Sequence, residues 1–181
     1  MTSLPKRKHP RLKNYDYSEN GAYFITICTK NKAHILSRII PSPDVGRDDP
    51  GAPPVCVQLT KYGEIVDGYI HSIERAYPHV YVDHSVIMPN HVHLILRIAV
   101  PEGGAPRSSR PTVSQIIGAF KHLSNHDAGR SLWQTSFHDH VIRDQDGYNT
   151  IHDYITHNPS NWENDCFYLD NQEVHHVQTP K

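Results

Sequence analysis

Runs of apolar residues along the chain predict five extended segments. Residues 22–29 combine aromatic and β-branched side chains, and residues 34–40 and 55–59 are two shorter extended pieces. Residues 80–88 and 91–98 are two further apolar runs, which only a Pro-Asn pair separates. This tight connection and the β-branched content predict two adjacent antiparallel strands near the middle of a sheet.

Apolar residues recur at helical spacing in three other segments. The first begins at Thr60 and ends before Pro78, the second covers residues 112–125, and the third covers about 146–157. A capping threonine and downstream prolines are typical helix boundaries. Strands and helices in this order predict an α+β fold, a small antiparallel sheet with helices packed on one face.

The length of 181 residues fits one folded domain with a core of its own. We expect an N-terminal arm over residues 1–20, a single domain over residues 21–168 and a polar tail over residues 169–181. Two segments rich in proline and glycine, 41–54 and 100–111, are predicted loops.

Composition is that of an ordinary soluble protein, with 37% hydrophobic residues. No apolar run is long enough to cross a bilayer, and no apolar leader is recognisable, so we expect a cytoplasmic protein without a membrane partner. Cys28, Cys56 and Cys166 lie far apart, which indicates neither a zinc knuckle nor a disulfide framework.

The formal net charge of -1 excludes a uniformly basic DNA-binding surface. Positive residues are nevertheless concentrated in the N-terminal arm, at Lys6, Arg7, Lys8, Arg11 and Lys13. Such an arm can place several cations on phosphates although the whole chain is nearly neutral. A solubilising tail is the alternative, and composition does not decide between them.

His91 and His93 are the first candidate functional residues. They lie in a predicted strand, where alternate side chains share a face, so both imidazoles project the same way. Two imidazoles on one face form half of a metal site. A pair of hydrogen-bonded polar residues at a sheet surface is the alternative.

Tyr154 and Asn158 are the second candidate pair. They lie four positions apart in the last predicted helix, so a phenol and a carboxamide share one helical face. A phenolate can attack a phosphodiester whose charge a metal offsets, and the carboxamide oxygen could complete the metal's ligands. In the alternative reading, the tyrosine packs on the sheet and Asn158 caps the helix before Pro159.

A second His-x-His sequence, His138-Asp139-His140, fits the metal pattern poorly. Its middle residue is charged and its surroundings are less strand-like than those of His91. A contribution of His138 or His140 to the site stays open.

In these motifs the chain resembles the REP-associated tyrosine transposases, the single-tyrosine branch of the HUH endonucleases. Met88-Pro89-Asn90-His91-Val92-His93-Leu94 is followed about sixty positions later by Tyr154-Ile155 and Asn158-Pro159. Supporting similarities are Tyr23-Phe24-Ile25-Thr26, Phe120-Lys121, and Trp133-Gln134 ahead of His140-Val141-Ile142-Arg143. The resemblance spans residues 15–168, and the motifs occur in the family's order and spacing.

The resemblance implies a ferredoxin-like α+β domain with the HUH motif on a central strand. It also implies an enzyme of DNA transposition and recombination, which cuts single-stranded DNA beside a hairpin of palindromic sequence and transfers strands. Tyr154 would be the nucleophile that becomes joined to the 5′ phosphate, and His91, His93 and Asn158 would hold the metal. Lys121 is a further candidate DNA contact.

Mg²⁺ or Mn²⁺ is the expected cofactor, because two imidazoles and one carboxamide leave positions open for phosphate oxygens. The wider family contains monomers and dimers, so a homodimer whose tyrosine acts in the partner's site stays open. Two alternatives to the enzyme also remain. One is a hairpin-binding protein of the same fold with little or no cleavage activity, and the other is an unrelated metal hydrolase that activates water.

Overall fold

Four strands form one antiparallel sheet in the computed structural model, which describes residues 15–42, 55–104, 106 and 109–168. The strand order is β4-β5-β1-β6, and every neighbouring pair is antiparallel. The bounds are β1 Gly21–Cys28, β4 Val80–Ile87, β5 His91–Ile98 and β6 His138–Ile142. A separate hairpin pairs β2 (Ser37–Pro41) with β3 (Val55–Leu59).

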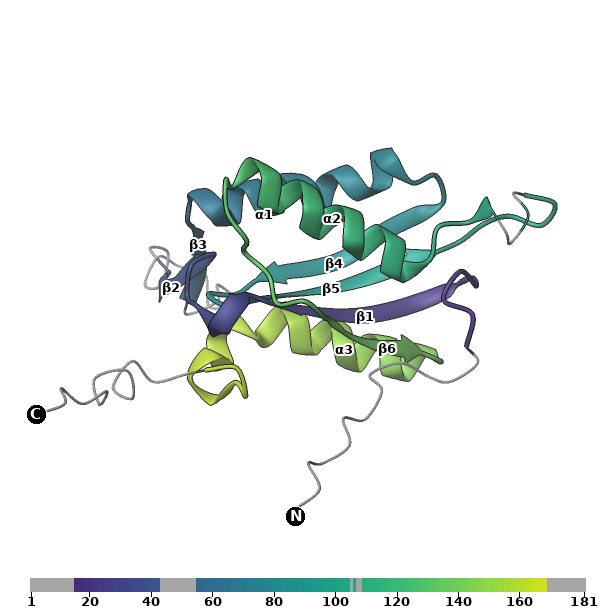
Figure 1. Cartoon of the computed structure of the whole chain (residues 1–181). Coiled ribbons are helices and arrows are strands. Elements are labelled where there is room, and N and C mark those ends of the chain that lie inside the picture. Colours follow the sequence, from purple (N-terminus) through teal and green to yellow (C-terminus); the bar gives the residue numbers. More distant parts are fainter. Residues whose placement is uncertain (1–14, 43–54, 105, 107–108, 169–181) are drawn as a thin grey trace, which may run out of the picture.

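Three helices cover the sheet. Helices α1 (Lys61–Ala76) and α2 (Val113–Asp127) lie on one face, and α3 (Gln145–His157) lies on the other (Figure 1). The chain order β1-α1-β4-β5-α2-β6, combined with the strand order, is that of a ferredoxin-like fold. The predicted α+β class is therefore confirmed, and the strand that carries His91 and His93 is central, between β4 and β1.

Each helix begins at a residue that caps it. The Thr60 hydroxyl accepts hydrogen bonds from two N–H groups of the first turn of α1. Thr112 and Gln115 form a reciprocal capping box at α2, and the Asp144 carboxylate accepts from the Gly147 N–H at α3. These side chains satisfy N–H groups that have no partner within the helix, which fixes where each helix starts.

Two apolar cores lie on opposite faces of the sheet. The larger one packs the sheet against α1 and α2, and the smaller one gathers Ile95, Ile142 and Ile155 beneath α3. The prediction that the helices share one face therefore holds for α1 and α2 and is corrected for α3. The reason is that β5 is apolar on both faces, with Leu94 on one and Ile95 on the other, so each face needs a cover.

The other predicted elements are found at nearly the predicted positions, with two differences. The second extended piece begins only at Ser37, after a short 3-10 turn, η1 (Lys30–Lys32). Residues 138–142, which are not among the five predicted extended segments, form the edge strand β6. Most of the predicted arm and the whole predicted tail lie outside the described residues. Among the helices that are described, none combines the length and apolar character that crossing a bilayer requires.

Candidate metal centre

His91 and His93 lie side by side on the face of β5 that α3 covers. Their ring centroids are 4.4 Å apart, and the two residues are 0% and 1% exposed. Val92 and Leu94 alternate with them and enter the larger core on the opposite face. The strand periodicity that put both imidazoles on one face is therefore confirmed.

The second nitrogen of each imidazole makes a hydrogen bond that orients the ring. Nδ1 of His91 donates to Oδ1 of Asn90 over 2.9 Å, because a carboxamide oxygen can only accept. Nδ1 of His93 lies 2.9 Å from the hydroxyl of Thr26 on β1. Metal-binding histidines in proteins usually have such a partner. Nε2 of His91 is buried, has no hydrogen-bond partner among the described residues and can accept a ligand.

Asn90 is itself held firmly in the turn before β5. Its carbonyl oxygen accepts the backbone N–H of Thr29 at 2.9 Å, and the Thr29 hydroxyl oxygen lies 3.0 Å from it. Its carboxamide nitrogen donates to the carbonyl oxygen of Phe167 at 2.8 Å. Buried polar groups with satisfied hydrogen bonds restrict a turn to one geometry, so the position of His91 is fixed before any ligand binds.

Helix α3 brings Tyr154 to the same site. Its hydroxyl lies 3.3 Å from Nε2 of His93, and its ring packs edge-on against Phe24 at a centroid distance of 6.0 Å. Ile155, the next residue, is buried in the smaller core and anchors the helix. Tyr154 is nevertheless 42% exposed, so a substrate can reach its hydroxyl.

Asn158 lies one helical turn beyond Tyr154 and is 2% exposed. It is the C-terminal cap of α3, as one reading of the sequence proposed. Its carboxamide nitrogen donates to Oδ2 of Asp165 at 2.9 Å. Its oxygen is buried, and no residue in the described part of the chain hydrogen-bonds to it. The oxygen is therefore available as a ligand, so capping and metal binding do not exclude each other.

Asp165 is a candidate metal ligand that the sequence analysis missed. It follows the 3-10 turn η3 (Pro159–Asn164) and offers a carboxylate that also accepts from the Tyr154 hydroxyl at 3.3 Å. The ligand atoms of His91, His93 and Asp165 lie within 4.8 Å of one another, so these three residues could hold a metal ion. The distance in sequence between Asp165 and the two histidines follows no helical or strand periodicity. The sequence therefore gave no indication that Asp165 lies beside them.

Burial sets the protonation of the site. It lowers the pKa of His91 to about 4, partly opposed by Asp165, and it lowers the pKa of His93 to about 2. Burial also raises the pKa of Tyr154 to about 12, and the charge of Asp165 adds to that effect. At neutral pH both imidazoles are therefore uncharged, as metal ligands must be, and the phenol keeps its proton.

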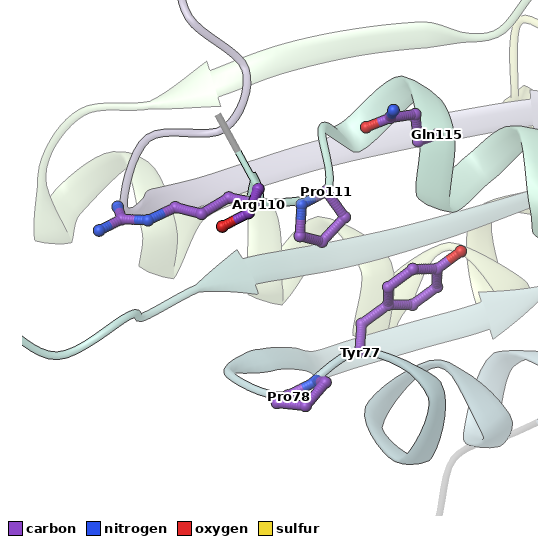
Figure 2. Close-up of a pocket in the computed structure, with 6 residues that line it drawn as sticks. Tyr77, Pro78, Arg110, Pro111 and Gln115 are labelled. Atoms are coloured by element: carbon purple, nitrogen blue, oxygen red, sulfur yellow. The ribbon is translucent and has the colours of Figure 1, made fainter. Parts of the chain in front are cut away.

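A hollow of about 350 Å³ opens beside Tyr154, lined also by His157, Asn158, Asn161, Asn164, Asp165 and Cys166. A larger pocket of about 510 Å³ lies elsewhere, where Tyr77 and Pro78 face Arg110, Pro111 and Gln115 (Figure 2). None of the candidate metal ligands lines this larger pocket, and neither does Tyr154. The smaller hollow is lined by Tyr154 together with two candidate ligands, Asn158 and Asp165, so it is the stronger candidate for a functional site.

Of the residues predicted to bind DNA, the structure describes only Lys121. Lys6, Arg7, Lys8, Arg11 and Lys13 lie outside the described residues. Lys121 is half-buried, and its ammonium group donates to the carbonyl oxygens of Gln134, Thr135 and Ser136. It therefore stabilises the segment that leads into β6, and a DNA contact by Lys121 stays a prediction.

His138 and His140 lie on β6 opposite Thr26 and Phe24 of β1. Directly opposed residues of antiparallel strands share a face, so both project on the side that carries His93. Both are exposed, and β1 separates them from β5. Among the described residues, the group with metal-binding geometry does not include them.

No protein-family model matches the chain. It is 32% identical over 182 residues to an uncharacterized protein of Haemophilus influenzae, and the match covers 91% of this chain and 94% of that protein. It is also similar to the structure of a REP-associated tyrosine transposase bound to a REP hairpin, with a TM-score of 0.59 and 20% identity over 84% of this chain and 73% of that one. The chain therefore belongs to the same family as the Haemophilus influenzae protein, and its fold is that of the REP-associated tyrosine transposases, as its motifs indicated.

Proposed function

We propose that this protein is a metal-dependent endonuclease and strand transferase that cuts single-stranded DNA beside a hairpin through Tyr154. One observation carries the proposal: the exposed phenol of Tyr154 lies beside two buried imidazoles whose rings are oriented by hydrogen bonds. Its hydroxyl oxygen is 3.3 Å from Nε2 of His93. The Tyr154 hydroxyl also lies 3.3 Å from Oδ2 of Asp165, a third candidate ligand, which supports a role beyond packing. Its proposed biological role is in DNA transposition and recombination.

His91, His93 and Asn158 are the proposed metal ligands, and Asp165 adds a carboxylate. The unpartnered Nε2 of His91 and the unpartnered oxygen of Asn158 support this assignment, since buried polar atoms normally have partners. A mixed nitrogen and oxygen set with open positions suits Mg²⁺ or Mn²⁺. Bound there, the cation would act as a Lewis acid that offsets the charge of the phosphodiester.

Tyr154 is the proposed nucleophile. Its oxygen attacks the phosphorus, the bond to the 3′ oxygen breaks, and the 5′ phosphate remains on the tyrosine. The leaving 3′ oxygen takes up a proton from water and becomes a 3′ hydroxyl. Asp165 accepts the hydrogen bond of the phenol and so provides an acceptor for its proton at 3.3 Å. Attack by a 3′ hydroxyl on the phosphotyrosine reverses the reaction, so strands can be rejoined without ATP.

A DNA hairpin with a single-stranded flank is the proposed partner. The REP-associated tyrosine transposase of similar fold was solved bound to a REP hairpin, which supports a DNA hairpin as the partner. The arm with Lys6, Arg7, Lys8, Arg11 and Lys13, outside the domain of residues 21–168, is proposed to contribute affinity for the hairpin but no chemistry.

Covalent capture of DNA tests the proposal. The chain is incubated with end-labelled hairpin oligonucleotides and Mn²⁺, and the products are separated on a denaturing gel. Wild type should give a protein-linked band, and Tyr154→Phe should give none. Tyr148→Phe is the matched control, because Tyr148 lies on the same helix but its hydroxyl contacts Asp83 instead.

Two further variants separate the alternatives. His91→Gln and His93→Gln should abolish cleavage and leave hairpin affinity largely intact, because the metal serves chemistry more than affinity. Hairpin binding by wild type without any linked product would favour a binding protein of this fold. Cleaved DNA that carries no protein and forms equally in Tyr154→Phe would favour a hydrolase that activates water.

A further inference from the structure

The turn Lys30–Lys32 has an unusual backbone beside the metal centre. Asn31 and Lys32 both have positive φ, 58° and 53°. Asparagine tolerates this left-handed region, whereas lysine rarely adopts it. Two such residues in succession indicate that the surrounding structure enforces the turn, and enforced strain is found preferentially at functional sites.

Hydrogen bonds hold this turn in a fixed position. The Lys32 N–H donates to the Thr29 carbonyl at 3.1 Å, and the Thr29 hydroxyl donates to the Ala33 carbonyl at 2.8 Å. The Asn90 carboxamide nitrogen donates to the Lys32 carbonyl at 3.4 Å. The same carboxamide orients His91 through its oxygen, so the turn and the metal ligand are fixed by one side chain.

The Lys32 side chain extends to the edge of the site. Its ammonium nitrogen lies 5.4 Å from the centroid of the Phe167 ring, and that ring lies 4.7 Å from the His91 ring. Lys32 is half-buried and Lys30 is exposed. Asp165, in contrast, brings a negative charge to the site that repels a phosphate. A cation at this position offsets that repulsion.

We propose that the Lys30–Lys32 turn is a phosphate-binding element, in which Lys32 contacts a backbone phosphate of the single-stranded flank next to the cut. This assignment rests on the proposed function and deepens it, because it names the part of the DNA that the site holds. Lys30, exposed on the same turn, adds a second cation. The fixed turn holds Lys32 in a constant position relative to His91. A phosphate bound by Lys32 would therefore position the flank relative to the metal and Tyr154.

The competing role for Lys32 is structural, as an anchor for Phe167. Lys32→Met removes the charge and keeps the aliphatic length, whereas Phe167→Leu removes the ring and keeps the charge. Lys61→Met is a matched control, because Lys61 also lies over an aromatic ring, that of Tyr62 at 4.9 Å, but on α1. All variants are made in a Tyr154→Phe chain with Mg²⁺, so that binding is measured without cleavage.

Affinity is measured for a hairpin with a single-stranded flank and for the same hairpin without it, at several salt concentrations. Lys32→Met should weaken binding of the flanked hairpin several-fold and reduce the log–log salt slope by about 0.7, the value for one single-strand phosphate contact. Binding of the bare hairpin should not change. Phe167→Leu and Lys61→Met should keep the wild-type slope.

Two results would overturn the inference. One is a Lys32→Met protein with unchanged affinity and slope, and the other is a Phe167→Leu protein that loses flank affinity as Lys32→Met does. If Lys32→Met fails to fold by circular dichroism, Lys32→Arg replaces it and must retain the wild-type salt slope. The outcome is independent of the covalent-capture test, since a flank contact can persist when no product forms and cleavage can occur without Lys32.

Discussion

The Tyr154 hydroxyl lies 3.3 Å from Nε2 of His93, although 61 positions separate the two residues. Strand β5 and helix α3 each contribute one partner, and the smaller core that contains Ile95 and Ile155 holds them together. The nitrogen that would bind a metal is thus the one that the phenol approaches. Binding of a cation must therefore change the surroundings of Tyr154.

We expect Mn²⁺ to lower the pKa of Tyr154 below its value of about 12, because a cation offsets the charge of Asp165. The difference in tyrosinate absorbance between wild type and Tyr154→Phe, titrated with and without metal, measures this shift. Equal titration curves in the two conditions would mean that no cation binds near the phenol.

Thr26→Val should weaken metal binding about 10–100-fold, because the hydroxyl that orients His93 through Nδ1 is lost. Isothermal titration with Mn²⁺ gives the affinity. Valine has nearly the same shape as threonine, so the sheet should persist. Thr150→Val, on the exposed side of α3, is the control and should leave the affinity unchanged.

Asp165→Asn and Asn158→Ala distinguish the third ligand. A lost ligand should reduce Mn²⁺ affinity at least about tenfold, or about 1.4 kcal/mol. Asp165→Asn should in addition lower the pKa of Tyr154 in the absence of metal, because the carboxylate charge raises it. Asp153→Asn, an exposed aspartate on α3, is the charge control. Full affinity in both site variants would leave the histidines as the sole protein ligands.

Stability should fall as the pH is lowered from about 6.5 to 4. The pKa values of His91 and His93 are depressed in the folded chain to about 4 and about 2, so in this range the unfolded chain binds more protons. The free energy of unfolding therefore decreases, by up to about 1.4 kcal/mol per pH unit for each histidine. Urea midpoints from pH 7.5 to 4.5 measure it.

Replacing one of the two histidines should flatten that profile, provided that the variant folds. A wild-type profile that is flat over this range would contradict the burial of neutral imidazoles.

Deleting residues 1–14 should weaken hairpin binding and reduce its salt dependence. The segment contains Lys6, Arg7, Lys8, Arg11 and Lys13, and each phosphate contact contributes about 0.9 to the log–log slope on duplex DNA. Cleavage chemistry should survive at saturating DNA. If the truncated chain keeps both affinity and slope, the arm is only a solubilising tail.

Local patterns in the sequence were sufficient to predict much of this protein. Side chains alternate along any strand, so His91 and His93 had to share a face. Residues four apart meet on any helix, so Tyr154 and Asn158 had to project together. These relations depend only on backbone periodicity, and for that reason the two halves of the site were predictable from their spacing.

Tertiary packing decided what periodicity leaves open. Helix α3 lies on the histidine face because the second apolar face of β5 needed a cover, and only that choice brings Tyr154 to His93. Asp165 reaches the site because a 3-10 turn with the buried Trp162 redirects the chain after α3. Edge strand β6 forms by pairing with β1 despite its polar sequence. Such positions depend on contacts between distant segments, which no local pattern encodes.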